Sequence, residues 1–583
     1  MTAPTLASDA RVWLSLHCFA YWPAGDLDRF LCRTVAPLLD RLRDEGRVAD
    51  WFYIRYWEGG PHLRLRLRGT DPATAAWLRD ELGRLLAEAP FTAADIDGEA
   101  YYRGLGGNAA RSQADWHRHG DVREIAYVAE TARYGGPDAL ATAEEVFCRS
   151  SEVAVRVVAA TPDPRTRLAA ATELTIATAT ALGLDRLGAA RWLRAHAAGW
   201  RWNGEVAMLP TALMQERTAR VLAAQAATLN GRWTRTVEAV AADPEGRRSP
   251  VTGWAAAVRD AHARLRELEP AAGAGRWLAV WASQLHMMFN RLGITPDEER
   301  SVCWLVAGTA LAPAGPQPFF ADGVQAADRG YHEASKYLLG GASDHAPREA
   351  DGPPSLPRFP GMSPPTPLPA HEAPNATLVD VLRRRRSARG ALTGPVDAAD
   401  LGTLLWTAYS VSHHEQITLP DGSTYRFGHR PYPSAGAKYV ARLRLIARDV
   451  AGLAPGCYHV DPVERVLWQL GDAPSDVDLV ATSDWFQPGR SPYEGLDISA
   501  LPAMLALYVE LGRLRPRYGL RGLRFATAEA GHLAQNLSLV GAATGLSVGM
   551  IGGFYDDVVH EVVGLDGIDN IAIYLLPVGR QRR

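Results

Sequence analysis

The chain has 583 residues, more than the roughly 250–300 over which one hydrophobic core grows, so at least two domains are expected. Its 62 basic and 65 acidic residues give a net charge of −3, which excludes a global field that would draw the protein to nucleic acid or anionic lipid. The five cysteines lack CxxC spacing, so the sequence predicts no disulfide framework and no metal site. It has no signal-peptide pattern and no apolar run of about 20 residues, so we expect a cytoplasmic protein without a membrane span.

A proline-rich arm lies between two differently composed halves. Prolines crowd together in residues 344–374, where hydrophobic periodicity disappears. We expect an N-terminal domain at 1–322 and a C-terminal domain at 323–583 that includes the arm. Both domains are predicted to be α+β, the first with a small sheet and a helical remainder.

Alternating polar and apolar residues predict the strands of the first half. WFYIRYWEGGPHLRLRLRG carries two such runs around a Gly-Gly-Pro turn, as a hairpin requires. Ala, Leu and Arg at helical spacing predict helices elsewhere. The predicted strands are residues 12–22 and 50–68, and the predicted helices are residues 24–46, 71–88 and most of 120–300.

The second half again mixes helices and strands. Two helices are predicted first, at 377–386 with Asn375 as its cap and at 401–409. A long helix at 526–545 is broken by Gly545. The predicted strands are residues 441–448, 503–510 and 571–577.

Three arginines alternate with leucines on the second strand of the hairpin. With a period of two, Arg64, Arg66 and Arg68 point to one face. We expect His62 on the opposite face unless the turn re-aims it. Because adjacent arginines repel one another, this face favours an anionic partner. An amphipathic strand with a solvated face would have the same pattern.

Two further features of this half are candidates for proton transfer. Glu130 and Arg133 lie three residues apart in EIAYVAETARYGG, which on a helix places them on one face in ion-pair range. His286 lies in the apolar helical segment SQLHMMFNRLG. A structural ion pair and a histidine packed in the core would give the same patterns.

A family resemblance covers about residues 10–310. The small domain of class I lanthipeptide dehydratases, also found alone as the thiopeptide-type bacteriocin biosynthesis domain, resembles this half in WFYIRYWEGGPHLRLRLRG, ETARYGG and SQLHMMFNRLG. The resemblance implies removal of glutamate from Ser or Thr residues that a tRNA-dependent partner enzyme has glutamylated, leaving dehydroalanine or dehydrobutyrine. It implies that the elimination residues are Arg64, Arg66, Glu130, Arg133 and His286. Arginines stabilise negative charge but cannot act as bases, so Glu130 or His286 would take the proton, and His has the better pKa for it.

Four segments of the second half together suit a flavin mononucleotide. RRRRSAR, at 383–389, offers guanidinium groups and a hydroxyl to a phosphate. RPYPSAGAKY, at 430–439, has small residues in a turn where the backbone can approach a flat ring. The other two are the helix and glycine pair of 529–554 and the C-terminal VGRQRR. A solvated basic patch, ordinary turns and a frayed tail would show the same features.

These segments resemble, in order and spacing, the SagB-type dehydrogenase branch of the nitroreductase family. The resemblance covers about residues 325–583 and includes YHEASKYL at 331–338 as the opening motif. It implies an α+β homodimer that binds FMN and oxidises thiazolines and oxazolines to thiazoles and oxazoles. It implies phosphate contacts from Arg385, Ser387 and Arg389, to which Arg580 would add, and ring contacts from Pro433, Ser434, Gly436, Gly552 and Gly553.

The expected proton acceptor of the oxidation departs from the family pattern. Where the azoline dehydrogenases carry a Lys-Tyr pair, this sequence has Arg517 and Tyr518. An arginine stays protonated and cannot accept a proton, but its charge would lower the pKa of a neighbouring tyrosine. Tyr518 is therefore the first candidate for the base, and Lys438, in the ring-facing loop, is the second.

The two resemblances together imply a bifunctional enzyme that tailors a precursor peptide of leader and core, as in thiopeptide biosynthesis. Three alternatives stay open: a dehydrogenase fused to a [4+2] pyridine synthase, a dehydrogenase whose first half only holds the peptide, and a non-catalytic scaffold that binds peptide or tRNA. All five elimination residue types are present, which favours elimination over cycloaddition. We expect no membrane partner and no direct nucleic-acid substrate.

Overall fold

The computed structural model of the chain divides into two compact units. The first comprises Met1–Leu209 and Arg217–Pro316, and the second comprises Pro210–Glu216 and Gln317–Arg583. Both mix helices with sheet, which confirms the predicted α+β class. No helix in the described ranges combines the length and apolar character that a membrane span needs. The structure describes residues 13–112, 114–269, 274–315, 326–337, 364–372, 375–418, 422–487 and 495–581, so most of the proline-rich arm lies outside the described residues.

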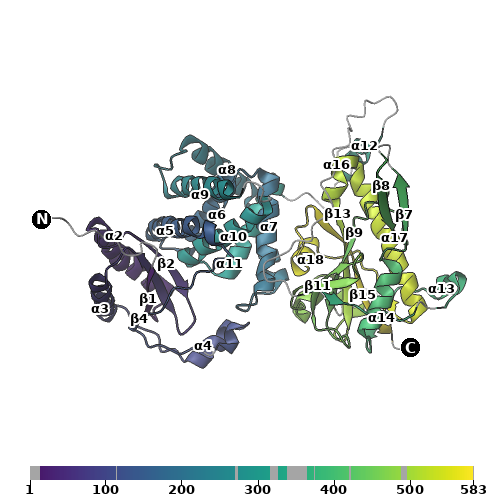
Figure 1. The fold of residues 1–583 in the computed structure, drawn as a ribbon, viewed down its shortest axis with the longest axis horizontal. Helices are drawn as coiled ribbons and strands as arrows, with labels where there is room; N and C mark the ends of the chain where they lie inside the picture. Colours follow the sequence, from purple (N-terminus) through teal and green to yellow (C-terminus); the bar gives the residue numbers. More distant parts are fainter. Residues whose placement is uncertain are drawn as a thin grey trace. The chain divides into compact units, whose positions relative to one another are not determined.

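The first unit contains a four-stranded antiparallel sheet in the order β2-β3-β1-β4 (Figure 1). Its strands are β1 (Trp13–Phe19), β2 (Asp50–Tyr56), β3 (His62–Arg68) and β4 (Val122–Glu124). β2 and β3 form the predicted hairpin. Leu63, Leu65 and Leu67 are fully buried, so one face of β3 belongs to the core.

Helices make up the rest of the first unit, and several begin at a capping side chain. Asp71, Asp163, Asp185, Ser249 and Thr295 each accept a hydrogen bond from a backbone N–H of the first turn. α5 and α10 lie against β2, and α11 lies along α7. The helices are α1 (Ala24–Phe30), a π-helical turn (Leu31–Val35), α2 (Ala36–Asp44), α3 (Pro72–Glu88), α4 (Gly98–Leu105), α5 (Pro137–Ala160), α6 (Pro164–Ala181), α7 (Arg186–Asn203), α8 (Thr211–Ala242), α9 (Pro250–Leu268), α10 (Ala274–Leu292) and α11 (Pro296–Leu311). The first residues of α8, 211–216, are assigned to the second unit.

The helix predicted from about residue 120 begins only at Pro137. β4 and a turn precede it, because Gly135 and Gly136 adopt φ values of 95° and 99° that no helix contains. Glu130 and Arg133 therefore lie in the turn, where the Arg133 N–H donates to the Glu130 carbonyl at 2.9 Å. The prediction that these two residues share a helical face is wrong, although their ion pair forms.

The second unit is built on a nine-stranded sheet in the order β12-β6-β15-β13-β9-β10-β11-β5, with β14 beside β15. All its strand pairs are antiparallel except β12 with β6. α17 packs against β9, β13 and α14 over the apolar core, and ends at Gly545, whose φ is 77°. The strands are β5 (Thr366–Pro367), β6 (Gly390–Thr393), β9 (Ala441–Ala447), β10 (Gly456–Asp461), β11 (Val466–Gly471), β12 (Leu496–Asp497), β13 (Ala503–Glu510), β14 (Ser547–Val548) and β15 (Asn570–Gln581). The helices are α12 (Ala327–Ala334), α13 (Leu378–Arg384), α14 (Ala398–Ala408), α15 (Asp476–Val480), α16 (Arg515–Tyr518), α17 (Arg521–Thr544) and α18 (Asp556–Val562).

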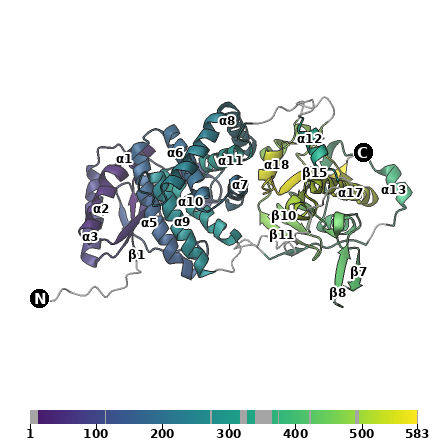
Figure 2. The ribbon, with the colours of Figure 1, turned by 90° about the horizontal axis from the view of Figure 1, so that it is seen from above.

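A separate two-stranded hairpin, β7 (His413–Thr418) and β8 (Thr424–His429), extends away from this sheet (Figure 2). The sequence did not predict it, because its mostly polar residues lack a buried face. Two local predictions are also corrected. α13 is capped by the Thr377 side chain, which accepts from the Asp380 N–H at 3.2 Å, and not by Asn375. β15 continues past the predicted end at 577, because Arg580 pairs with Thr393 of β6.

Candidate active sites

The polar face of β3 carries a row of charged and titratable side chains. The expectation for His62 is wrong, because it lies an even number of residues from the arginines and shares their face. Its Nε2 accepts a hydrogen bond from Nε of Arg64 at 3.1 Å. Its Nδ1 lies 2.7 Å from the carbonyl oxygen of Gly60, which can only accept, so Nδ1 carries the proton.

A histidine of β1 holds Arg66 in the same way. Nη1 of Arg66 lies 3.3 Å from Nε2 of His17, and since a guanidinium only donates, the imidazole accepts. The rings of His17 and His62 stack with 4.8 Å between their centroids. Burial and the neighbouring arginines lower the pKa of His17 to about 2 and that of His62 to about 3. Both imidazoles are therefore neutral near pH 7.

The three arginines of β3 differ in what balances their charge. Arg68 forms an ion pair with Asp50, which raises the pKa of Arg68 against the effect of burial. Burial lowers the pKa of Arg66 to about 10, and in the described part of the chain no carboxylate pairs with it. The Arg64 pKa is also lowered by burial, and the Nη2 of Arg64 lies 3.9 Å from the Glu58 carboxylate, beyond hydrogen-bond distance.

Glu130 and Arg133 belong to the electrostatic neighbourhood of Arg64. The Glu130 carboxylate is among the groups that raise the pKa of Arg64 against burial. Arg133 donates from Nη1 to Glu130 at 3.0 Å and from Nε to Oγ of Ser283 on α10 at 3.2 Å. Ser283 lies one helical turn before His286. The turn after β4 thus links the β3 arginines to α10.

His286 is bound to a buried carboxylate of α11. Oε2 of Glu299 lies 2.9 Å from Nδ1 of His286, and Oε1 lies 2.5 Å from Nε2 of His196 and accepts from Nε1 of Trp200 at 3.0 Å. Burial alone would raise the Glu299 pKa, but the two histidines lower it to about 2. Because this carboxylate is ionised, His286 donates from Nδ1, and its Nε2 keeps a lone pair that can accept a proton.

In the second unit, the ring-facing loop (residues 433–438) lines a cavity of about 760 Å³ together with the β7–β8 hairpin. Pro433, Ser434 and Gly436 contribute to its wall. Gly436 has a φ of 58°, and a Cβ there would lie 2.5 Å from the hydroxyl of Tyr518. The structure therefore brings Tyr518 to the loop. The amino group of Lys438 makes no hydrogen bond or ion pair with any described residue.

A buried glutamate anchors the ring-facing loop. Oε2 of Glu529 accepts from the Ser434 hydroxyl at 2.6 Å, and Oε1 accepts from the Ala441 N–H at 2.8 Å. The Ser434 oxygen accepts in turn from the Tyr439 N–H at 2.8 Å. Burial raises the pKa of Glu529, whose side chain is 1% exposed. This carboxyl group fixes the loop against α17 and β9.

The expected phosphate-binding segment lies near the glycine pair. The guanidinium of Arg389 lies 5.3 Å from the ring centre of Trp485, and a Cβ on Gly553 would lie 3.6 Å from the indole nitrogen of the same tryptophan. Gly552 and Gly553 are both exposed. Among the described residues, three polar side chains of this segment make no hydrogen bond or ion pair, those of Arg383, Arg385 and Ser387.

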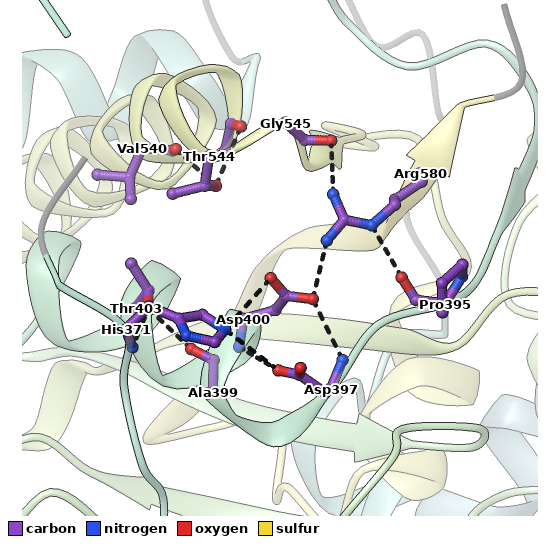
Figure 3. Close-up of polar contacts among 11 residues, drawn as sticks. His371, Pro395, Asp397, Ala399, Asp400, Thr403, Val540, Thr544, Gly545 and Arg580 are labelled. Carbon is purple, nitrogen blue, oxygen red and sulfur yellow. Dashed lines mark hydrogen bonds and ion pairs between the residues drawn. The ribbon is translucent and has the colours of Figure 1, made fainter. Parts of the chain in front are cut away.

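Arg580 is engaged in a network within the second unit (Figure 3). Its guanidinium donates from Nη2 to the Asp400 carboxylate at 2.9 Å and from Nε to the Pro395 carbonyl at 2.8 Å. A contact by Arg580 to a phosphate would require these bonds to break. The structural role of Arg580 is to join β15 to the start of α14.

Figure 3 also shows His371 beside the first turn of α14. Nε2 of His371 lies 3.6 Å from Oδ1 of Asp397 and 3.9 Å from Oδ1 of Asp400, a grouping that resembles a set of metal ligands. Both carboxylates are already engaged, because each caps α14 by accepting a backbone N–H, and Asp400 also binds Arg580. The grouping is therefore accounted for by helix capping.

Sequence reasoning missed the residues that hold the candidate catalytic groups. His17, Glu299 and His196 have no sequence pattern that indicates their partners. Glu529 lies in a segment that the sequence singled out, but no spacing rule connects it to Ser434, 95 residues away. The period of two would have placed His62 correctly.

Two protein families match separate parts of the chain. Residues 13–310 match the family described as Lantibiotic biosynthesis dehydratase C-term, and residues 382–580 match the Nitroreductase family. The putative nitroreductase MJ1384 of Methanocaldococcus jannaschii is 30% identical over 206 residues, which are 35% of this chain and 91% of that protein.

Part of the chain is also similar, at low identity, to two solved structures. Pyridine synthase TbtD from thiomuracin biosynthesis is 19% identical, with a TM-score of 0.41 over 52% of this chain and 98% of that chain. The tRNA dependent lantibiotic dehydratase MibB from Microbispora sp. 107891 is 24% identical, with a TM-score of 0.35 over 53% of this chain and 28% of that chain.

Proposed function

Because the chain belongs to the lantibiotic dehydratase C-terminal family over residues 13–310 and to the nitroreductase family over residues 382–580, we propose that it is a bifunctional enzyme that tailors a ribosomally made peptide. The first unit eliminates glutamate from glutamylated Ser or Thr to give dehydroalanine or dehydrobutyrine. The second unit oxidises azolines to azoles with FMN. The observation that carries the first assignment is a pair of arginines, Arg64 and Arg66, that no hydrogen-bonded carboxylate neutralises among the described residues.

The elimination needs a base, a cation for the intermediate and a site for the departing dicarboxylate. His286 takes the α-proton at Nε2, because Glu299 holds its Nδ1–H. Glu130 is already paired with Arg133 and is the weaker candidate for the base. The carbonyl oxygen that gains charge as the proton leaves is stabilised by guanidinium groups, and the β-oxygen departs with glutamate. Arg64, Arg66 and Arg133 supply these cations.

The second unit offers residues that suit FMN. Gly552 and Gly553 are exposed, and Gly436 has no room for a side chain because a Cβ there would collide with the Tyr518 hydroxyl. Backbone without side chains suits the close approach of a flat ring. Arg385, Ser387 and Arg389 would hold the phosphate with two guanidinium groups and a hydroxyl, whereas Arg580 is engaged elsewhere. When bound, FMN supplies the acceptor for the hydride of the azoline.

Tyr518 is our proposed proton acceptor in the oxidation. Its hydroxyl reaches the ring-facing loop at Gly436, and the guanidinium of Arg517 lies 5.7 Å from the centre of its ring. Lys438 belongs to the same loop and is the second candidate.

The proposed partners follow from these reactions. The substrate is a precursor peptide of leader and core, and a tRNA-dependent enzyme supplies the glutamylated residues. We propose that the chain forms a homodimer through the second unit, as flavin enzymes of the nitroreductase family do. Light scattering on the purified protein tests the dimer, and a fully active monomer would contradict it.

Mass spectrometry of a heterocyclised, glutamylated precursor after incubation with the FMN-loaded protein tests both activities at once. Each azole lowers the peptide mass by two hydrogens, and each elimination lowers it by one glutamate, so the two reactions are counted separately. Arg68→Ala is the matched control for Arg64→Ala, because Arg68 lies on the same strand and is already paired with Asp50. A glutamylated peptide that keeps its glutamates, or a product with a newly formed pyridine ring, would refute the elimination.

A further inference from the structure

Two histidines hold the catalytic arginines of β3 without neutralising them. Nε of Arg64 donates to Nε2 of His62 at 3.1 Å, and Nη1 of Arg66 donates to Nε2 of His17 at 3.3 Å. Both acceptors are uncharged lone pairs, because a guanidinium offers only donors. A carboxylate would orient an arginine equally well but would cancel its charge, as Asp50 does for Arg68 at the end of the same strand.

Because these side chains are buried, it matters whether the acceptor of each arginine is neutral or charged. His17 and His62 are 4% and 2% exposed, and Arg66 is 5% exposed, so charges here are weakly screened. The stacked imidazoles lie on adjacent strands, since Phe19 faces His62 and His17 faces Arg64 in the β1–β3 register. The neighbouring His117 packs on Phe19 and brings no negative charge. The result is a strand face with two guanidinium groups held by two neutral acceptors, where the nearest carboxylate, that of Glu58, stays 3.9 Å from Arg64.

Two buried polar atoms, one of Arg66 and one of Ser15, indicate where a ligand would bind. Nε of Arg66 and Oγ of Ser15 are both buried, and neither has a hydrogen-bond partner among the described residues. Ser15 lies directly opposite Arg66 in the β1–β3 register. A guanidinium N–H and a hydroxyl are the donors that a carboxylate accepts from. Leaving such donors buried and unpaired is unfavourable, so an anion that reaches them is bound tightly.

We propose that His17 and His62 are positioning residues that orient Arg66 and Arg64 while preserving their full charge for the carboxylates of the glutamyl group. This inference rests on the proposed elimination. It explains why the first unit would prefer a leaving group with two carboxylates. One arginine faces the carboxylate already present on the glutamyl group, and the other faces the carboxylate that forms when the ester bond breaks. Ser15 adds a neutral donor beside Arg66.

Substitutions that differ only in charge test this proposal. His62→Gln and His17→Gln supply a neutral oxygen acceptor at about the position of Nε2, whereas His62→Glu and His17→Glu supply a carboxylate of the same shape. We expect the Gln variants to keep kcat/KM for glutamate elimination within about 3-fold of the unchanged protein. We expect the Glu variants to lose about 10²-fold, the usual effect of losing one cation aimed at developing charge.

Binding of free L-glutamate, measured by titration calorimetry on the full chain, gives a readout independent of turnover. The Gln variants should bind it like the unchanged protein, and the Glu variants should bind it at least about 10-fold more weakly. Asp50→Asn, which releases Arg68, should change neither readout and is the matched control. A double-mutant cycle adds that His62→Glu has little further effect once Arg64 is replaced with alanine.

The possible outcomes separate this inference from the proposed function. If the unchanged protein does not eliminate glutamate, the proposed function fails, and L-glutamate binding still compares the variants. Equal activity and binding of the Gln and Glu variants would overturn the inference alone. Equal losses in both would assign the histidines a merely structural role. Circular dichroism identifies any variant that does not fold. In that case His17→Leu and His62→Leu, which remove the acceptor, should lower L-glutamate binding. Unchanged binding would overturn the inference.

Discussion

Replacing Glu299 tests how strongly a buried carboxylate stabilises the first unit. Its side chain is 1% exposed and lies between His286, His196 and Trp200. Burial acts to raise its pKa, but the histidines lower it from the ordinary 4.5 to about 2. A difference of this size corresponds to about 3 kcal/mol of unfolding free energy. Glu299→Ala removes the charge and leaves three donors unpaired, so we expect a loss of about 3–5 kcal/mol.

The chemically closest variant separates charge from packing. Glu299→Gln keeps the volume and an acceptor oxygen, and we expect a loss of about 1–3 kcal/mol. The assay is urea unfolding followed by tryptophan fluorescence, which reports mainly on the first unit because it holds most of the tryptophans. Glu145→Gln is the control, because its ion pair with Arg264 is about half exposed and contributes less than about 1 kcal/mol.

The pH dependence has a definite sign. The folded pKa of Glu299 lies below its ordinary value, so its contribution to stability is complete above about pH 4.5 and is lost as the pH falls toward 2. The Glu299→Gln variant should lack this acid-sensitive part of its stability. An alanine variant within 1 kcal/mol of the unchanged protein, or identical acid profiles for the Gln variant and the unchanged protein, would refute the reasoning.

Three further predictions concern the reactions. Arg64→Ala should slow glutamate elimination by about 10²–10³-fold while azole formation continues, as peptide mass spectrometry can show. Normal elimination by this variant would mean that the hairpin arginines have no catalytic role. Replacing Arg385 and Ser387 together with alanine should remove the flavin absorbance from the purified protein, and full occupancy would contradict the phosphate assignment. Tyr518→Phe should reduce azole formation by about 10²–10⁴-fold with flavin retained, and Lys438→Ala should be mild; the reverse pattern would make the lysine the base.

The local elements of the fold were predictable because local rules determine them. The alternation in β2 and β3 and the Gly-Gly-Pro turn predicted the hairpin, and the period of two predicted a shared face for Arg64 and Arg66. The same rule places His62 on that face, so the contrary expectation was an error of application. The helix predicted around Glu130 failed because the positive φ values of two glycines override helical spacing.

The supporting residues of both sites were not predictable, because they depend on long-range packing. Ser434 and Glu529 are 95 residues apart, and Arg580 and Asp400 are 180 apart. The pairing of His286 with Glu299 depends on how α10 and α11 pack after the turn between them, which sequence spacing does not specify. A family motif identifies the reacting residue, but the residue that orients it comes from another element.

The two candidate sites differ in how their residues are grouped within the chain. In the first unit, contacts lead from Arg64 of β3 through Glu130 and Arg133 to Ser283 of α10, so three of the candidate elimination residues share one electrostatic neighbourhood. In the second unit, the expected flavin residues fall into two groups. One is the ring-facing loop with Tyr518 and Glu529, and the other is Arg389 with the glycine pair around Trp485. Under the proposed homodimer, one copy would supply the first group and its partner the second. On this proposal, the first unit would eliminate glutamate within a single chain, whereas the second unit would oxidise azolines only as a dimer.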